Sequence, residues 1–202
     1  MLDRVALRLL RPAFDGGGRW LADHGAGADS VTWTGFAIGL GGAGAIAMRQ
    51  PALGLALLLA SRLCDGLDGA VARHTAPTDR GAFLDIALDF LFYASVPLAF
   101  ALADPAANAL AAAVLLAAFI GTGSSFLAFA ALAAKRGITS LAYPSKGIYY
   151  LGGLTEAAET LACFAAMCLW PSVFAELAYG FAGLCLLTIV TRVWTGWKLL
   201  GT

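Results

Sequence analysis

Residues 65–89 read DGLDGAVARHTAPTDRGAFLDIALD, and this stretch decides what kind of protein the chain encodes. It holds five Asp, two Arg and one His in a chain that is 60% hydrophobic. Four of the Asp stand at helical spacings, Asp65 with Asp68 and Asp85 with Asp89. An Asp at a bilayer centre costs about 2.5–3.5 kcal/mol on insertion scales, and neighbouring carboxylates also repel each other. The stretch therefore predicts a bound cation.

The remaining sequence predicts an all-α membrane protein with a single domain over residues 1–202. Only 13% of the residues are charged, and the mean hydropathy is +0.79. Long apolar stretches recur along the whole chain, which is typical of a polytopic membrane protein. We expect six transmembrane helices, at residues 31–48, from 52 through the Asp65 region, and at 82–102, 106–134, 147–169 and 173–197.

The first 23 residues predict an amphipathic helix on the membrane surface rather than a further span. On a helical projection, apolar residues share one face and basic residues another, namely Leu2, Val5 and Leu9 against Arg4, Arg8 and Arg11. A frayed N-terminus is the alternative.

The basic residues predict the orientation in the membrane. Of the 13 Lys and Arg, only Arg49 falls on one side of the predicted layout. The others, Arg73 and Lys198 among them, fall on the opposite side. We therefore expect an integral protein of a bacterial-type inner membrane, with both termini and the Asp cluster facing the cytoplasm.

The four clustered Asp predict a site for Mg²⁺ or Mn²⁺. Asp65 and Asp68 end one predicted span and Asp85 and Asp89 begin the next, so the two pairs can converge between antiparallel helices. Oxygen-only ligands suit hard divalent cations. Any one of these Asp alone would be interpreted as a solvated helix cap, but the complete set is not explained in that way.

Glycine and arginine beside the Asp cluster indicate a phosphate-containing ligand. Gly69 leaves room for a ligand to approach the backbone, and Gly81 opens the next span. Arg73 lies one turn beyond Gly69 and can pair with a phosphate. We expect a nucleotide or activated phosphodiester. Asp79 and Arg80, in the intervening loop, are expected to be solvated and outside the site.

The string D-x-x-D-G-x-x-A-R-x7-G-x-x-x-D-x-x-x-D, complete in residues 65–89, resembles the signature of the CDP-alcohol phosphatidyltransferase family. The resemblance implies transfer of a substituted phosphate from a CDP-linked donor to a small alcohol, with release of CMP, in phospholipid biosynthesis. The leading candidate for the donor is CDP-diacylglycerol. It also implies a homodimer among membrane lipids, with no nucleic-acid partner.

The same resemblance implies roles for the motif residues. Asp65, Asp68, Asp85 and Asp89 would bind the metal, and Asp89 would also be the catalytic base on the acceptor hydroxyl. The donor would contact Asp65 as well and a further set of residues, namely Thr32, Gly69, Ala72, Arg73, Thr78 and Gly81.

One position departs from the family. Members often carry Pro-Asn-x-x-Thr before the first span, and residues 28–32 here read ADSVT. Thr32 is kept, whereas Asp29 replaces the Asn. Any contact of that Asn with the donor nucleotide is therefore in question.

Candidate acceptor residues lie outside the motif. Lys135, Arg136 and Lys146 could bind an acceptor phosphate, and ordinary positive-inside charge explains them equally well. Glu156 and Glu159 fall inside the predicted fifth span, where ionisable residues are functional candidates. They could bind acceptor hydroxyls, or they could be a protonated pair that bonds across helices.

The alternative function is a divalent-cation channel or an ion-coupled transporter, with the Asp cluster as its mouth. Arg73 and the glycine spacing argue against it, because a cation entrance has no use for them. A catalytically silent family member is disfavoured because no motif position is missing.

Overall fold

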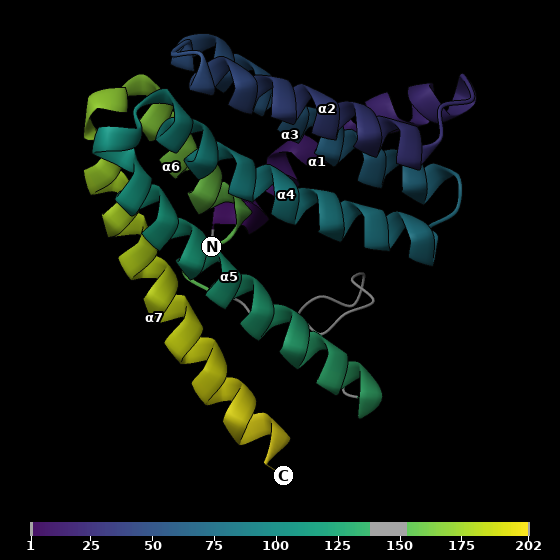
Figure 1. Cartoon of the computed structure of the whole chain (residues 1–202). Helices are drawn as coiled ribbons and strands as arrows, with labels where there is room; N and C mark the ends of the chain where they lie inside the picture. Colours follow the sequence, from purple (N-terminus) through teal and green to yellow (C-terminus); the bar gives the residue numbers. More distant parts are fainter. Residues whose placement is uncertain (1, 138–152, 202) are drawn as a thin grey trace.

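The structure, a computed structural model, describes residues 2–137 and 153–201, and the side chains from residue 11 onward. These residues are all helical apart from short connections (Figure 1). The helices are α1 (Leu2–Asp23), α2 (Ala28–Ala47), α3 (Pro51–His74), α4 (Asp79–Ala103), α5 (Pro105–Lys135), α6 (Ala157–Leu169) and α7 (Phe174–Leu200), with a 3₁₀ turn at Pro171–Val173.

The predicted N-terminal helix is present as α1, and it packs against α3. Gly18 is buried where the two helices meet, and a Cβ there would clash with Ala70. The ring of Phe14 likewise fills the space beside Gly66. The α1 helix therefore lies directly behind the turn of α3 that carries Asp65 and Asp68.

α2 packs against both α3 and α4 and holds the two motif helices in place (Figure 1). Gly35 is buried where α2 crosses α3 beside Cys64, and Gly39 is buried against Phe92 of α4. Neither position has room for a Cβ, so this GxxxG pair allows the helices to pack closely.

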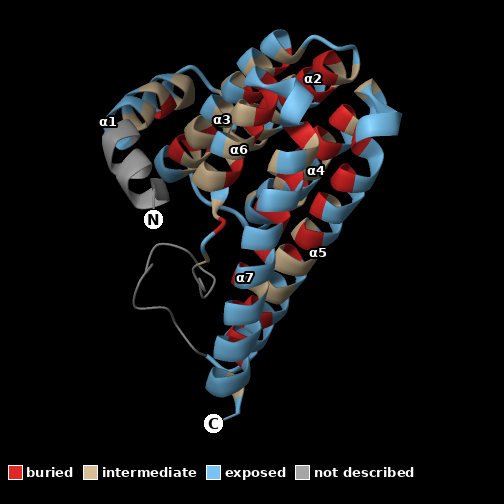
Figure 2. Ribbon diagram, turned by 90° about the vertical axis from the view of Figure 1, so that its left-hand side faces the viewer, coloured by how far each residue is buried: buried red, intermediate tan, exposed pale blue. Residues whose placement is uncertain are grey.

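The main apolar core lies where α4, α5, α6 and α7 meet (Figure 2). Phe92 and Leu115 are fully buried there, and Phe100 stacks on Phe174 with ring centroids 4.5 Å apart. Large apolar side chains also face outward along the long helices, as expected for surfaces that contact lipid.

Within residues 2–137 and 153–201, four helical segments are long and apolar enough to cross a membrane, namely Ala28–Ala47, Asp79–Ala103, Pro105–Lys135 and Pro171–Leu200. They correspond to four of the six predicted spans. α3 has the length of a span but carries the motif charges, and α6 has only 13 residues.

The predicted fifth span at 147–169 is wrong in part. Residues 153–156 are not helical and α6 begins at Ala157, while residues 147–152 lie outside the described chain. The reason is a tertiary contact, because the Thr188 hydroxyl of α7 accepts hydrogen bonds from the amides of Leu154 (3.2 Å) and Thr155 (3.3 Å). These bonds hold the segment in a non-helical path.

Candidate functional site

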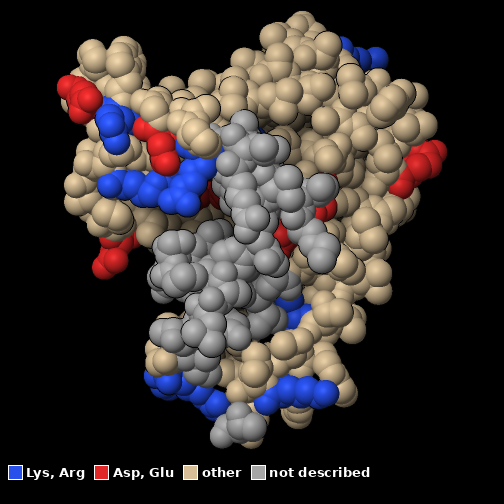
Figure 3. Space-filling model, turned by 180° about the vertical axis from the view of Figure 1, so that it is seen from behind, with Lys and Arg blue, Asp and Glu red and all other residues tan. Residues whose placement is uncertain are grey.

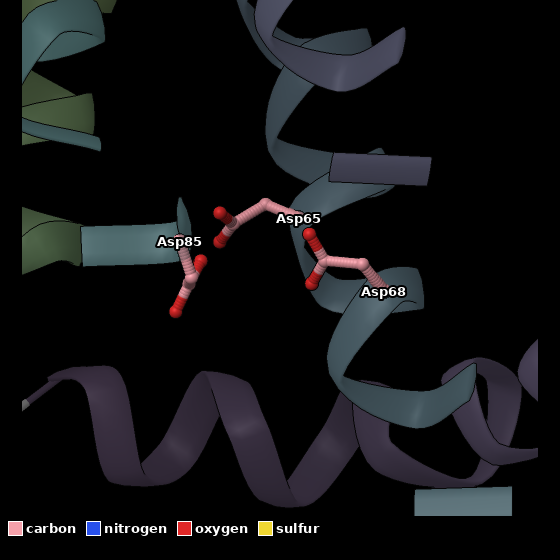
Figure 4. Close-up of side chains that lie close together, drawn as sticks. All are labelled: Asp65, Asp68 and Asp85. Carbon is pink, nitrogen blue, oxygen red and sulfur yellow. The ribbon is translucent and has the colours of Figure 1, made fainter. Parts of the chain in front are cut away.

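Three of the four predicted metal ligands converge. Asp65 and Asp68 project from α3 and Asp85 from α4, and each offers a carboxylate oxygen within 4.8 Å of the other two (Figure 4). The three-residue spacing places Asp65 and Asp68 on one face of α3. The turn over residues 75–78 brings α4 back toward that face, so that Asp85 lies opposite.

The oxygen donors of this group fit a hard divalent ion such as Mg²⁺ or Mn²⁺. Asp68 is buried, and its Oδ2 accepts a hydrogen bond from Thr32 of α2 at 2.6 Å. Thr32 was expected to contact the donor, whereas the structure places its hydroxyl on a candidate metal ligand. Hydrogen bonds of this kind orient ligands and tune their affinity.

The fourth Asp has a different partner. Asp89 Oδ1 accepts a hydrogen bond from Arg62 Nη1 at 2.6 Å, and the same nitrogen lies 3.3 Å from Asp65 Oδ1. The Arg62 guanidinium also lies over the Phe92 ring, 3.9 Å from its centroid. Sequence reasoning missed Arg62, although its position one turn before Asp65 on the same helix face was an available signal.

Arg73, the predicted phosphate partner, makes an ion pair in this structure. Its Nη2 lies 2.8 Å from Asp15 Oδ1 of α1, and this hydrogen bond holds the pKa of Asp15 below its usual value. Asp15 was also missed from the sequence. Beside Gly69, an added Cβ would meet only the Arg73 side chain at 3.7 Å, so the backbone there is accessible as predicted.

The start of α4 is held by short-range contacts. Thr78 is its N-cap, and its hydroxyl accepts a hydrogen bond from the Gly81 amide at 3.0 Å. Arg80 was expected to be solvated, and its side chain is 84% exposed, yet it pairs with Asp29 of α2. Asp29 also stands beside Gly81, where an added Cβ would lie 3.2 Å from Asp29 Oδ1.

A cavity of about 650 Å³ extends from Asp89 toward the α6 end of the bundle. Its described lining is mainly apolar. Polar groups line it from three helices and the segment before one of them, namely Asp89 and Tyr93 of α4, Thr122 and Ser124 of α5, Thr155 and Glu156 before α6, and Thr160 within α6.

The two predicted intramembrane glutamates form a capping box at the start of α6. Glu156 is the N-cap and accepts from the Glu159 backbone, while Glu159 Oε2 accepts from the Glu156 amide at 3.3 Å. The expected carboxylate pair on one face of a continuous helix is therefore wrong. Of the two, Glu156 lines the cavity.

The basic acceptor candidates lie elsewhere. Lys135 and Arg136 are exposed at the end of α5, and neither lines the cavity at Asp89. In the space-filling view, some Lys and Arg atoms lie along the lower edge of the molecule, and others lie at the upper left, at the upper right and near the middle (Figure 3). Lys146 lies outside the described residues.

Known proteins resemble this chain in sequence and in fold. The family model of CDP-alcohol phosphatidyltransferase matches residues 28–194. Over 200 residues the chain is 51% identical to the inner membrane protein YnjF of Escherichia coli, covering 99% of this chain and 97% of that protein. The chain is also 46% identical over 65 residues to an archaetidylinositol phosphate synthase of Methanothermobacter thermautotrophicus. This shorter match covers 32% of this chain and 33% of that protein.

Solved structures share the fold. Phosphatidylinositol phosphate synthase of Mycobacterium tuberculosis with CDP-DAG bound superposes with a TM-score of 0.73 at 22% identity, covering 91% of this chain and 93% of that one. The structure of the same enzyme in complex with manganese and citrate superposes with a TM-score of 0.72 at 22% identity, covering 91% of this chain and 88% of that one.

Proposed function

The chain belongs to the CDP-alcohol phosphatidyltransferase family, and on that premise we propose that it transfers a phosphatidyl group from CDP-diacylglycerol to an alcohol, with release of CMP, in phospholipid biosynthesis. The observation that carries the proposal is the convergence of Asp65, Asp68 and Asp85 within a complete family motif. The chain is a membrane enzyme of this family, and the donor and acceptor are the proposed part.

In the proposed reaction, an acceptor hydroxyl oxygen attacks the phosphorus that carries the diacylglycerol group. The bond from that phosphorus to the bridging oxygen breaks, CMP leaves with that oxygen, and the acceptor proton passes to Asp89. A divalent ion held by Asp65, Asp68 and Asp85 would neutralise charge on the pyrophosphate and stabilise the leaving CMP. In such transfers, positioning and electrostatics supply most of the rate.

The protein groups have separate proposed tasks. Gly69 and Ala72 allow the CDP portion to lie against α3. Arg73 leaves its ion pair with Asp15 and pairs with a phosphate of the donor instead. Thr78 and Gly81 shape the opposite wall, and Thr32 holds Asp68 in place as a ligand. Asp89 is within reach of both the metal cluster and the cavity, which supports its role as the base.

The cavity beside Asp89 is the proposed acceptor site. It offers hydroxyl and carboxylate groups to an alcohol, with Glu156 and Thr160 at its α6 end. Glu159 would act indirectly by holding the Glu156 backbone. Lys135, Arg136 and Lys146 would attract an anionic acceptor from the solvent.

The proposed topology has six spans, with α3 and α6 crossing alongside the four long apolar segments. Positive-inside charge supports a cytoplasmic active site and cytoplasmic termini, because Arg73, Arg80 and Lys198 lie toward one side and Arg49 toward the other. α1 would lie on the membrane surface. Family resemblance supports a homodimer.

The test is an acceptor panel. Purified protein in lipid nanodiscs receives CDP-diacylglycerol, Mg²⁺ or Mn²⁺ and one alcohol at a time, and CMP release and lipid mass are measured. We expect CMP and a new phospholipid with at least one acceptor, and neither without metal. Absence of both turnover and donor binding across the panel would contradict the proposal. Mn²⁺ flux into liposomes without nucleotide would instead favour the channel or transporter.

A further inference from the structure

Arg62 is a largely buried cation inside the acidic site. Its side chain is only 13% exposed, and its Nη1 lies between Asp89 Oδ1 at 2.6 Å and Asp65 Oδ1 at 3.3 Å. Because Arg62 belongs to α3 and Asp89 to α4, this ion pair links the two motif helices.

The surroundings keep the guanidinium where it is. Arginine stays charged at every accessible pH, and a charge shielded from water needs opposite charges beside it. Asp65 and Asp89 supply them, and the face of Phe92 covers the guanidinium at 3.9 Å. Arg62 Nε has no hydrogen-bond partner among the described residues, whereas Nη2 donates to Ser61 Oγ at 3.5 Å, so the two carboxylates, this hydroxyl and the aromatic face hold the side chain.

The position of Arg62 limits where a divalent ion can bind. The oxygens of Asp65, Asp68 and Asp85 form one compact group, and Asp89 is not part of it. An ion bridging Asp65 and Asp89 would have to stand against the guanidinium, where like charges repel. The cluster thus divides into a divalent site at one end and an arginine-filled site at the other.

We propose that Arg62 takes the place of a second metal ion, so that the enzyme binds one divalent ion per chain. The guanidinium neutralises Asp65 and Asp89 as a second ion would, and it holds the Asp89 carboxylate in a fixed orientation. Arg62 is in this sense a positioning residue. The inference rests on the metal site of the proposed function but not on the donor or the acceptor.

The test counts Mn²⁺ ions bound to the full-length protein in nanodiscs, by equilibrium dialysis and electron paramagnetic resonance. Wild-type protein should bind one Mn²⁺ per chain and give the spectrum of an isolated ion. Arg62→Met removes the charge and should allow two ions per chain with a spin-coupled spectrum. Arg62→Lys keeps the charge and should bind one, as should the matched control Arg80→Met, which removes an exposed Arg from α4.

Each possible Mn²⁺ count either supports or overturns the role proposed for Arg62. Two coupled ions in wild-type protein, or a single ion in folded Arg62→Met, would overturn the inference and leave the proposed function standing. No Mn²⁺ binding at all would overturn the inference and the metal site of the proposed function together. If Arg62→Met fails to fold, the wild-type count and Asp89→Asn still decide, because one retained ion in Asp89→Asn is expected and its loss would overturn the assignment.

Discussion

The two acidic regions of this protein look alike in sequence and differ in structure. The motif carboxylates of Asp65, Asp68 and Asp85 face one another from two helices. Glu156 and Glu159 instead accept hydrogen bonds from backbone amides at the start of a single helix. The first arrangement places negative charge where only a cation can balance it, whereas the second uses the carboxylates to begin a helix. The partners of a carboxylate, more than its position in an apolar stretch, show which role it has.

The largest loss of activity is expected from a substitution at Asp68. We expect Asp68→Asn to reduce CMP release below detection, because a carboxamide is a poor ligand for a hard divalent ion. Its Mn²⁺ affinity should fall by more than roughly 100-fold, the upper end for losing a group that only supports a ligand. The control is Asp79→Asn, an exposed Asp of the same stretch. Normal turnover in Asp68→Asn would remove Asp68 from the site.

A smaller effect is expected at Asp89. Asp89→Asn should reduce turnover by about 10²–10⁴-fold, the usual contribution of a general base, while donor and Mn²⁺ binding persist. Stopped-flow or discontinuous CMP assays measure the loss, and calorimetry measures binding. Wild-type rates in this variant would rule out Asp89 as the base.

The support given to the metal ligand is tested at Thr32. Thr32→Val removes the hydroxyl that donates to Asp68 and should weaken Mn²⁺ binding about 10–100-fold. Thr34→Val is the matched control, because the Thr34 hydroxyl donates only to its own helix at Ser30 O. Equal Mn²⁺ affinity in the two variants would show that the bond to Asp68 is without consequence.

The second region is tested at Thr188, where the expected effect is on stability. Thr188→Val leaves the Leu154 and Thr155 amides without their acceptor and should cost about 1–3 kcal/mol of unfolding free energy. Thr191→Val, an exposed neighbour that bonds only within α7, should cost far less. Denaturation in detergent compares the two. Equal losses would mean that the segment before α6 is held by other contacts.

Local spacing in the sequence predicts part of this structure, and contacts between distant residues account for the rest. The spacing of Asp65, Asp68 and Asp85 predicts their convergence, because helix periodicity and one short turn determine it. The same reasoning missed Arg62, whose role depends on Asp89 lying across the site, and Asp15, whose partner Arg73 is on another helix. It extended the fifth helix through residues 153–156 because no local pattern reveals a hydroxyl contributed by Thr188.

Arg192 has a consequence for how α5 and α7 are held together. It is buried two turns before the end of α7, where its Nη1 donates to the Thr122 carbonyl of α5 at 3.1 Å and its guanidinium lies 5.6 Å from the Phe126 ring centroid. Since an unpaired arginine within a transmembrane helix is costly, the contact with α5 stabilises Arg192 in its place on α7. The two long helices are therefore tied together by one side chain, because a backbone carbonyl of α5 accepts the hydrogen bond of the guanidinium of α7.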